Sequence, residues 1–203
     1  MNVNDMIGYA ENLVEEKYNN QVWYDFVDTV LEELTPLAKV VQEDTVPLSI
    51  ADNKATISLS STYLTGLFEV VGVSLHSTGE RKKQLRKLAP YDTASLGWIH
   101  NDTAVTLINL PTTSANAVVH YYQNLTMTAT TSTVTDYTIN LPEKYHDIVV
   151  KGMCALSMQK EEEGDRKGDF YGEYTMGKRR LLSERIMAVE PWNAQAIMGG
   201  GGK

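Results

Sequence analysis

Apolar side chains recur at three- and four-residue spacing along the first forty residues. Two stripes separated by Asn19-Asn20 show it: Met6, Ala10, Leu13, Val14 and Tyr18, then Val22, Trp23, Phe26, Val27, Val30, Leu31 and Leu34. This spacing places the apolar side chains on one face of a helix. Asn4 or Asp5 is suited to cap the first helix, and Pro36 weakens the second near its end. The pattern predicts two antiparallel helices joined by a tight turn.

From Thr45 the period shortens to two, which is typical of strands. Residues 47–59 predict a hairpin with its polar turn at 51–54, and further strands are expected over 67–75, 81–85, 98–100, 105–110 and 118–122. The threonine-rich stretch 126–138 predicts a loop or an edge hairpin. The spacing of turns favours a small antiparallel sheet or sandwich.

Helical periodicity returns after Pro142, which suits the first turn of a helix. A third helix is predicted to end at Glu161-Glu162-Glu163-Gly164, and a fourth to run from about Asp169 to Ile186. Residues 190–203 contain Pro191 and four consecutive glycines, so they should have no regular structure of their own.

These blocks predict an α+β fold in which four helices form a bundle that is the core of the protein. Residues 1–44 supply its two N-terminal helices and residues 142–189 its two C-terminal helices. An antiparallel β module, residues 45–141, is inserted between them, and residues 190–203 form an extended tail.

Composition narrows the classes of function. The chain has 203 residues, a single cysteine and a formal net charge of −8. One thiol excludes a disulfide framework, and no apolar stretch approaches the roughly 20 residues that a membrane span needs. The negative balance argues against non-specific nucleic-acid binding, which requires Lys and Arg to neutralise phosphates. The acidic start of the chain lacks the pattern of a signal peptide, so we expect a protein made in a cytoplasm.

The residues that carry chemistry in enzymes form no recognisable pattern. The histidines His76, His100, His120 and His146 lack a second His or Cys at a ligand spacing, and no phosphate loop or nucleophile signature occurs. We therefore expect no catalytic residues, no metal and no cofactor. His120 is expected to have a structural role beside Tyr122, and His146 to form a surface or capping pair with Asp147.

Two charged clusters are candidate contact sites for a partner or a neighbouring subunit. The basic cluster consists of Arg81, Lys82, Lys83, Arg86 and Lys87, and the acidic cluster of Glu161, Glu162 and Glu163. Either cluster can also be a solvated surface. The tail carries Trp192, Ile197 and Met198, and large apolar side chains of this kind are typical anchors of an interface. Trp192 packing on the last helix of its own chain is the alternative.

The order of these segments resembles the head–tail adaptor proteins of tailed bacteriophages. The resemblance lies in the paired N-terminal helices, a Pro-flanked strand leading to "YYQNLT", and "LPEKYHDIVVKGMCALSM" opening a long helix. An acidic break and a last helix with Phe170, Tyr171, Tyr174 and Arg179 follow.

The resemblance implies a structural protein of the virion neck, assembled in the host cytoplasm. Such a protein forms a ring, usually twelvefold, that docks on the portal, meets tail or neck proteins, and surrounds double-stranded DNA without reading its sequence. The helices would form the ring wall and lumen, and the C-terminal residues 190–203 would extend toward the portal. An alternative is a β-rich binding module of a tail or neck component, whose sign would be exposed aromatic residues on strands.

Overall fold

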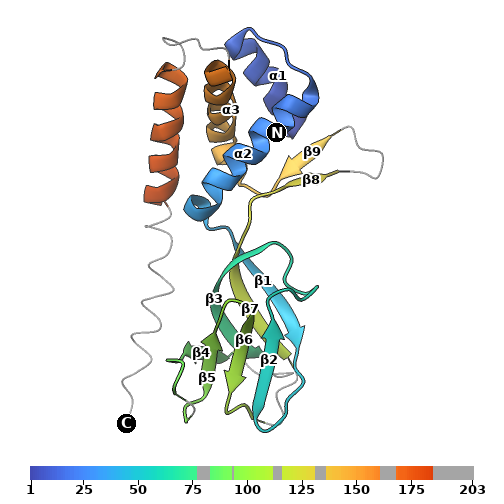
Figure 1. Cartoon of the computed structure of the whole chain (residues 1–203), viewed down its shortest axis with the longest axis vertical. Helices are drawn as coiled ribbons and strands as arrows, with labels where there is room; N and C mark the ends of the chain where they lie inside the picture. The colour runs from blue at the N-terminus through green and yellow to red at the C-terminus, as the bar shows by residue number, and fades with distance from the viewer. Residues whose placement is uncertain (77–82, 93, 112–115, 131–135, 161–167, 185–203) are drawn as a thin grey trace. The chain divides into compact units, whose positions relative to one another are not determined.

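The computed structural model describes residues 1–76, 83–92, 94–111, 116–130, 136–160 and 168–184. The chain divides into two compact units. Residues 1–39 and 125–203 form a helical unit, and residues 40–124 form a β unit (Figure 1).

Two helices open the helical unit, and an asparagine caps each of them. Helix α1 spans Val3–Val14, and Asn2 caps it through a reciprocal pair of hydrogen bonds with Asp5. The expected cap at Asn4 or Asp5 is therefore wrong, because both residues lie inside the first turn of the helix. Helix α2 spans Asn20–Ala38, and the side chain of Asn19 accepts a hydrogen bond from the backbone of Val22. These bonds satisfy backbone N–H groups that have no partner inside the helix. Both helices therefore begin close to where the periodic stripes begin.

Helix α3 is the centre of the helical unit. It spans His146–Lys160 and follows a 3-10 turn, η1, at Glu143–Tyr145. Ten of its fifteen residues are buried, because α1 and α2 both pack on it and a fourth helix, residues 168–184, packs on it as well. The short hairpin of β8, Met127–Ala129, and β9, Tyr137–Ile139, completes the unit.

The β unit contains a curled seven-stranded sheet (Figure 1). Along the sheet the order is β1-β7-β3-β4-β5-β6-β2, and all neighbours are antiparallel except β4 and β5, which are parallel. The strands are β1 Val41–Pro47, β2 Lys54–Ser58, β3 Leu67–His76, β4 Lys83–Lys87, β5 Gly97–His100, β6 Ala104–Ile108 and β7 Asn116–Gln123. The expected purely antiparallel module is therefore a mixed sheet.

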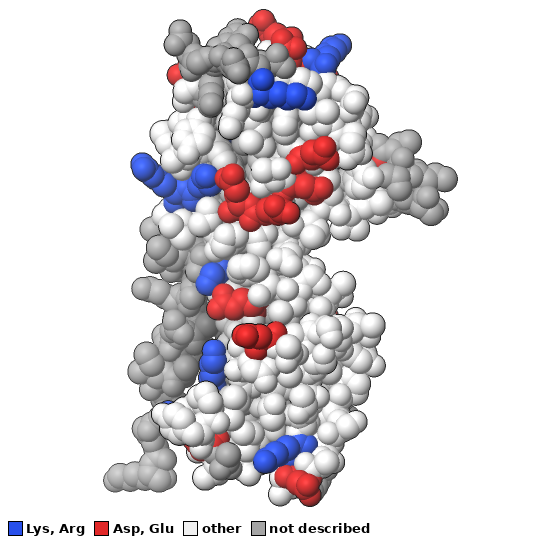
Figure 2. Space-filling model, in the orientation of Figure 1, with Lys and Arg blue, Asp and Glu red and all other residues white. Residues whose placement is uncertain are grey.

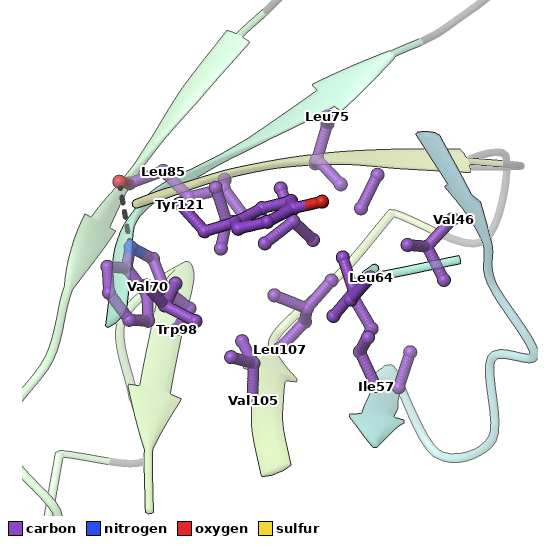
Figure 3. Packing of buried hydrophobic residues seen from close by; sticks show 14 of the residues in the cluster. Val46, Ile57, Leu64, Val70, Leu75, Leu85, Trp98, Val105, Leu107 and Tyr121 are labelled. Atoms are coloured by element: carbon purple, nitrogen blue, oxygen red, sulfur yellow. Dashed lines mark hydrogen bonds between the residues drawn. The ribbon is translucent and has the colours of Figure 1, made fainter. Parts of the chain in front are cut away.

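The inner face of this sheet encloses a hydrophobic core of its own. Side chains from all seven strands contribute to it, and in Figure 3 those of Val46, Ile57, Leu64, Leu107 and Tyr121 point into one interior. The indole N–H of Trp98 donates to the carbonyl of Leu85 at 3.3 Å, which satisfies the polar atom of this buried ring. The cluster comprises Val46, Ala55, Ile57, Leu64, Val70, Val73, Leu75, Leu85, Trp98, Val105, Leu107, Leu110, Ala117, Val119 and Tyr121.

The expected four-helix bundle core is therefore wrong. The β unit buries its own apolar face, so the helices are not the core of the whole protein. The helices also do not occupy four equivalent corners. In a bundle each helix buries one stripe, whereas α3 is buried around most of its circumference by three others.

The predicted hairpin over 47–59 is also wrong in its pairing. The turn itself is present: Ala51 and Lys54 exchange two backbone hydrogen bonds of 2.9 Å, with Asp52 and Asn53 at positive φ. The strands on either side of it do not pair with each other, because β1 pairs with β7 and β2 pairs with β6. The turn therefore connects the two opposite edges of the sheet.

Candidate assembly surfaces

The basic cluster lies partly on β4. Lys83, Arg86 and Lys87 are exposed on either side of the buried Leu85, and the Lys87 ammonium lies 5.3 Å from the centre of the Trp98 ring. Lys87 thus belongs in part to the packing of the β unit, while Lys83 and Arg86 are open to a partner. Arg81 and Lys82 lie outside the described residues.

An acidic surface lies on α2 and was not predicted. Asp25, Asp28 and Glu32 are exposed at spacings of three and four, so they share one helix face. Figure 2 shows acidic side chains gathered over this part of the helical unit. Partial burial and repulsion from Glu32 and Asp25 raise the pKa of Asp28. The i, i+3, i+7 spacing of these carboxylates in the sequence is the signal that would have revealed the surface.

Polar contacts hold helix 168–184 against its neighbours. The Tyr174 hydroxyl donates to Glu33 of α2 at 3.0 Å, and the Lys178 ammonium lies 3.2 Å from the same carboxylate. Burial and the Glu33 charge raise the pKa of Tyr174, so its phenol stays protonated as the donor. These residues are therefore occupied inside the subunit.

The start of α3 is tied to the end of helix 168–184 in the same manner. The Glu184 carboxylate accepts from Lys144 at 2.8 Å and from the Tyr145 hydroxyl at 2.7 Å. These two hydrogen bonds lower the pKa of Glu184, and the same carboxylate raises the pKa of Lys144. Arg180 pairs with Asp147 at 3.1 Å. Apart from the buried Tyr145, these groups are at the surface, where such pairs contribute little to stability individually.

A carboxylate, an imidazole and a hydroxyl line up across three strands of the β unit. Glu43 of β1 lies 3.4 Å from Nδ1 of His120 on β7, and Nε2 of His120 lies 2.7 Å from the Ser74 hydroxyl on β3. This order resembles a hydrolase triad. However, Ser74 is only 3% and His120 only 8% exposed. A substrate could not reach the hydroxyl, so the contacts serve to join β1, β7 and β3.

The remaining candidates for chemistry are also structural. His146 is buried rather than on the surface, and its Nε2 contacts the carbonyl oxygen of Leu141 at 2.8 Å. Burial raises the pKa of the Cys154 thiol to about 12, which makes it a poor nucleophile. Within the described ranges, no group of three or more His, Cys, Asp or Glu is placed to hold a metal ion. No described helix is long and apolar enough to cross a membrane.

The other predicted contact residues are not among those described. Glu161, Glu162 and Glu163 fall in the gap at 161–167, and Trp192, Ile197 and Met198 fall in 185–203. Their roles stay predictions. Sequence reasoning also missed the large apolar side chains that the subunit leaves exposed on its helices, namely Tyr9, Tyr171, Met176 and Leu182. An apolar residue at an outward-facing helical position is the signal that would have identified them.

The described residues thus present exposed charged and apolar surfaces, while His120, Tyr174 and Glu184 make contacts inside the subunit. The chain belongs to the SU10 adaptor protein family, whose model matches residues 1–197. This confirms the predicted resemblance to phage head–tail adaptors. The protein is thus a structural component of a phage particle, of a family that contacts portal and tail proteins. A comparison with curated proteins found no match.

Proposed function

We propose that this adaptor assembles into a closed, twelvefold ring that docks on the portal, joins the DNA-filled capsid to the tail and lines the DNA exit channel. The family match over residues 1–197 carries this proposal.

The ring itself is tested by the mass of the assembled protein. Twelve copies of 22.6 kDa give 12 × 22.6, about 271 kDa. Native mass spectrometry and electron microscopy of the purified protein, alone and mixed with portal, should show this species. A protein that stays monomeric under both conditions would contradict the proposal.

The acidic surface of α2 supports a role next to DNA. A negatively charged channel wall repels the phosphate backbone, so a polyanion slides past instead of binding. Replacing Asp25, Asp28 and Glu32 by Lys should slow DNA ejection from particles that still assemble.

The matched control changes the charge by the same amount elsewhere. Asp52, Glu69 and Asp102 are exposed acids of the β unit, and replacing all three by Lys should leave ejection unchanged. Equal effects of the two triple variants would show that net charge alone matters and that the α2 surface does not face DNA.

The charged clusters are proposed to meet between neighbouring subunits. Arg81, Lys82, Lys83, Arg86 and Lys87 of one copy would contact the 161–163 carboxylates of the next. Because salt screens exposed charges beyond about 10 Å at 0.1 M, the ring should dissociate more readily at 0.5 M than at 0.05 M salt. A ring whose stability ignores salt would contradict this contact.

The tail is proposed to dock on the portal or on a neighbouring subunit through Trp192, Ile197 and Met198. Deleting residues 190–203 should leave the melting temperature of the subunit unchanged but prevent its incorporation into heads. Loss of stability in the isolated subunit would instead show that Trp192 packs in the core of its own chain. Trp192→Ala in the full chain tests the anchor alone, and incorporation as in the wild type would rule out that residue.

A β-rich binding module remains the second candidate, and one feature of β3 favours it. Register shifts interrupt its pairing with β7 between Leu67 and Glu69 and between Val70 and Gly72, so Phe68 and Val71 are extra residues of two bulges. Both are exposed apolar side chains, and bulges often redirect side chains at functional sites. Phe68→Ser with Val71→Ser should then leave the ring intact but weaken attachment of the phage tail to the particle. Unchanged attachment of the phage tail would rule out this candidate.

A further inference from the structure

Glycines inside helices divide into two kinds in this protein. Gly152 of α3 and Gly177 of helix 168–184 are required by internal packing. A Cβ on Gly152 would lie 2.7 Å from a methyl of Val30, and a Cβ on Gly177 would lie 2.9 Å from the side chain of Ile148. At these two positions the helices approach too closely for any side chain.

Gly8 of α1 and Gly172 of helix 168–184 have no such explanation. A Cβ at either position would meet nothing within 4 Å. Glycine weakens a helix interior relative to alanine, so the isolated subunit gains nothing from these two residues. A glycine on an exposed helix face does allow another backbone to approach closely.

Large apolar side chains stand beside both glycines. On α1, Asp5, Tyr9 and Asn12 form an exposed stripe opposite the buried face, and Tyr9 is 53% exposed. The stripe is apolar at its middle and acidic at one end. We call it the α1 stripe.

Helix 168–184 has a stripe of the same kind with the opposite charge. Gly172, Met176 and Arg179 are exposed at spacings of four and three, and Met176 is 66% exposed. Of the described basic residues on this helix, Lys178 and Arg180 are in ion pairs, whereas Arg179 is in none. We call this the Met176 stripe.

Contacts along α3 show at which level of the helical unit each stripe lies. The amino group of Met1 pairs with Glu143 just before α3, and Lys160 at its end lies 4.8 Å from the centre of the Tyr18 ring. Helix α1 therefore runs parallel to α3. Tyr9, halfway between Met1 and Tyr18, is level with the middle of α3.

Helix 168–184 runs in the opposite direction along α3. Glu184 pairs with Lys144 at 2.8 Å near the start of α3, and Glu173 pairs with Lys151 at 2.6 Å near its middle. Gly177, next to Met176, lies against Ile148, so Met176 is level with a point between Ile148 and Lys151 of α3. By the same measure Arg179 is level with its first turn.

The two stripes thus match in level, charge and apolar character. Met176 and Tyr9 lie within one helical turn of the same level, and Arg179 is level with Asp5. Figure 1 shows α3 standing between α1 and helix 168–184, so the stripes face opposite sides of the helical unit. A rotation about an axis parallel to α3 keeps these levels and brings one stripe against the other. Two different surfaces on opposite sides are what a closed ring of identical subunits requires.

We propose that the α1 stripe of one copy packs against the Met176 stripe of the next, and that this antiparallel helix pair is the ring interface. The inference rests on the proposed ring and names its contact. Met176 packs on the Tyr9 ring, a favourable sulfur–aromatic contact, while Asp5 faces Arg179. Gly8 and Gly172 let the two helices approach closely.

Cysteine cross-linking tests the contact in the full chain. Tyr9→Cys with Met176→Cys should give, after mild oxidation, a ladder of covalent multimers on a non-reducing gel, ending at the ring. The matched control, Thr29→Cys with Met176→Cys, carries a thiol on an exposed position of α2 instead and should give no ladder. The native Cys154 is buried and can stay.

Glycine replacement separates assembly from folding. Gly172→Leu should leave the melting temperature of the subunit unchanged or higher, because its Cβ has open space, yet abolish the ring in light scattering. Gly177→Leu should instead lower the melting temperature, because its Cβ meets Ile148.

The possible results distinguish failure of the proposed interface from failure of the proposed ring. Rings that form in the wild type without a Tyr9–Met176 ladder, or that persist in a folded Gly172→Leu variant, overturn this interface and leave the proposed function standing. A wild-type chain that forms no ring, alone or with portal, overturns both.

Discussion

Gly152 lies where α3 meets both α2 and helix 168–184, so Gly152→Ala probes the centre of the helical unit. The new methyl carbon would lie 2.7 and 3.0 Å from the two methyls of Val30 and 3.0 Å from a ring carbon of Tyr174. Carbon atoms pack favourably at about 3.5–4.0 Å. The methyl therefore overlaps with both neighbours, and one of these is a ring held by its hydrogen bond to Glu33.

Two opposing effects set the change in the free energy of unfolding that Gly152→Ala causes. Overpacking a core in this way costs about 1–3 kcal/mol. Replacing glycine by alanine in a helix interior returns about 1 kcal/mol through propensity. Gly152→Ala should therefore lower the free energy of unfolding by up to about 2 kcal/mol.

Gly172→Ala is the matched reference, because it makes the same chemical change in a helix where the Cβ has open space. It should raise stability by up to about 1 kcal/mol. The difference between the two variants cancels the propensity term and leaves the steric cost of about 1–3 kcal/mol. Urea unfolding followed by circular dichroism at 222 nm, with dilute subunits, measures both. Equal stabilities would show that α3 does not pack between its neighbours as described.

Three further predictions concern single side chains. Trp23 is fully buried and donates to Glu11 at 3.1 Å, so Trp23→Ala should cost about 3–5 kcal/mol in urea unfolding; a loss below about 1 kcal/mol would mean that the ring is not in the core. Asp28 has a raised pKa, so its ionised form is unfavourable at neutral pH; Asp28→Asn should raise the melting temperature at pH 7, and this gain should vanish below about pH 4, where the carboxyl is protonated in both states. A gain that is independent of pH would point to another cause. His120→Gln should lower the stability of the β unit without affecting assembly, because His120 joins β7 to Ser74; loss of function in a folded, assembled variant would instead require a ligand or catalytic role.

Local signals in the chain determined the helices and their starting points. The stripes of Met6 and Ala10 and of Val27 and Leu31 require one buried face each, which fixes the helices. The exact cap of the first helix was not predicted, because Asn2 and not Asn4 or Asp5 supplies it. The turn at residues 51–54 was also predictable, since it needs only residues that tolerate positive φ. The order of these local elements was enough to reveal the adaptor family, which the family match confirms.

The pairing of strands was not predictable, because a strand edge bonds to any strand that the fold brings beside it. Val41 pairs with Tyr122 across eighty residues, while the neighbouring β2 pairs with β6. For the same reason the triad-like line of Glu43, His120 and Ser74 was invisible in the sequence.

The centre of the helical unit was likewise decided by tertiary structure. Periodicity identifies which face of a helix is apolar but not how many neighbours cover it. Only the packing made α3, rather than a symmetric bundle, the centre around which the other helices lie. The same limit applies to the α1 and Met176 stripes. The sequence alone determined that Tyr9 and Met176 are apolar, but exposure is a property of the folded chain, because it depends on what the rest of the subunit leaves uncovered.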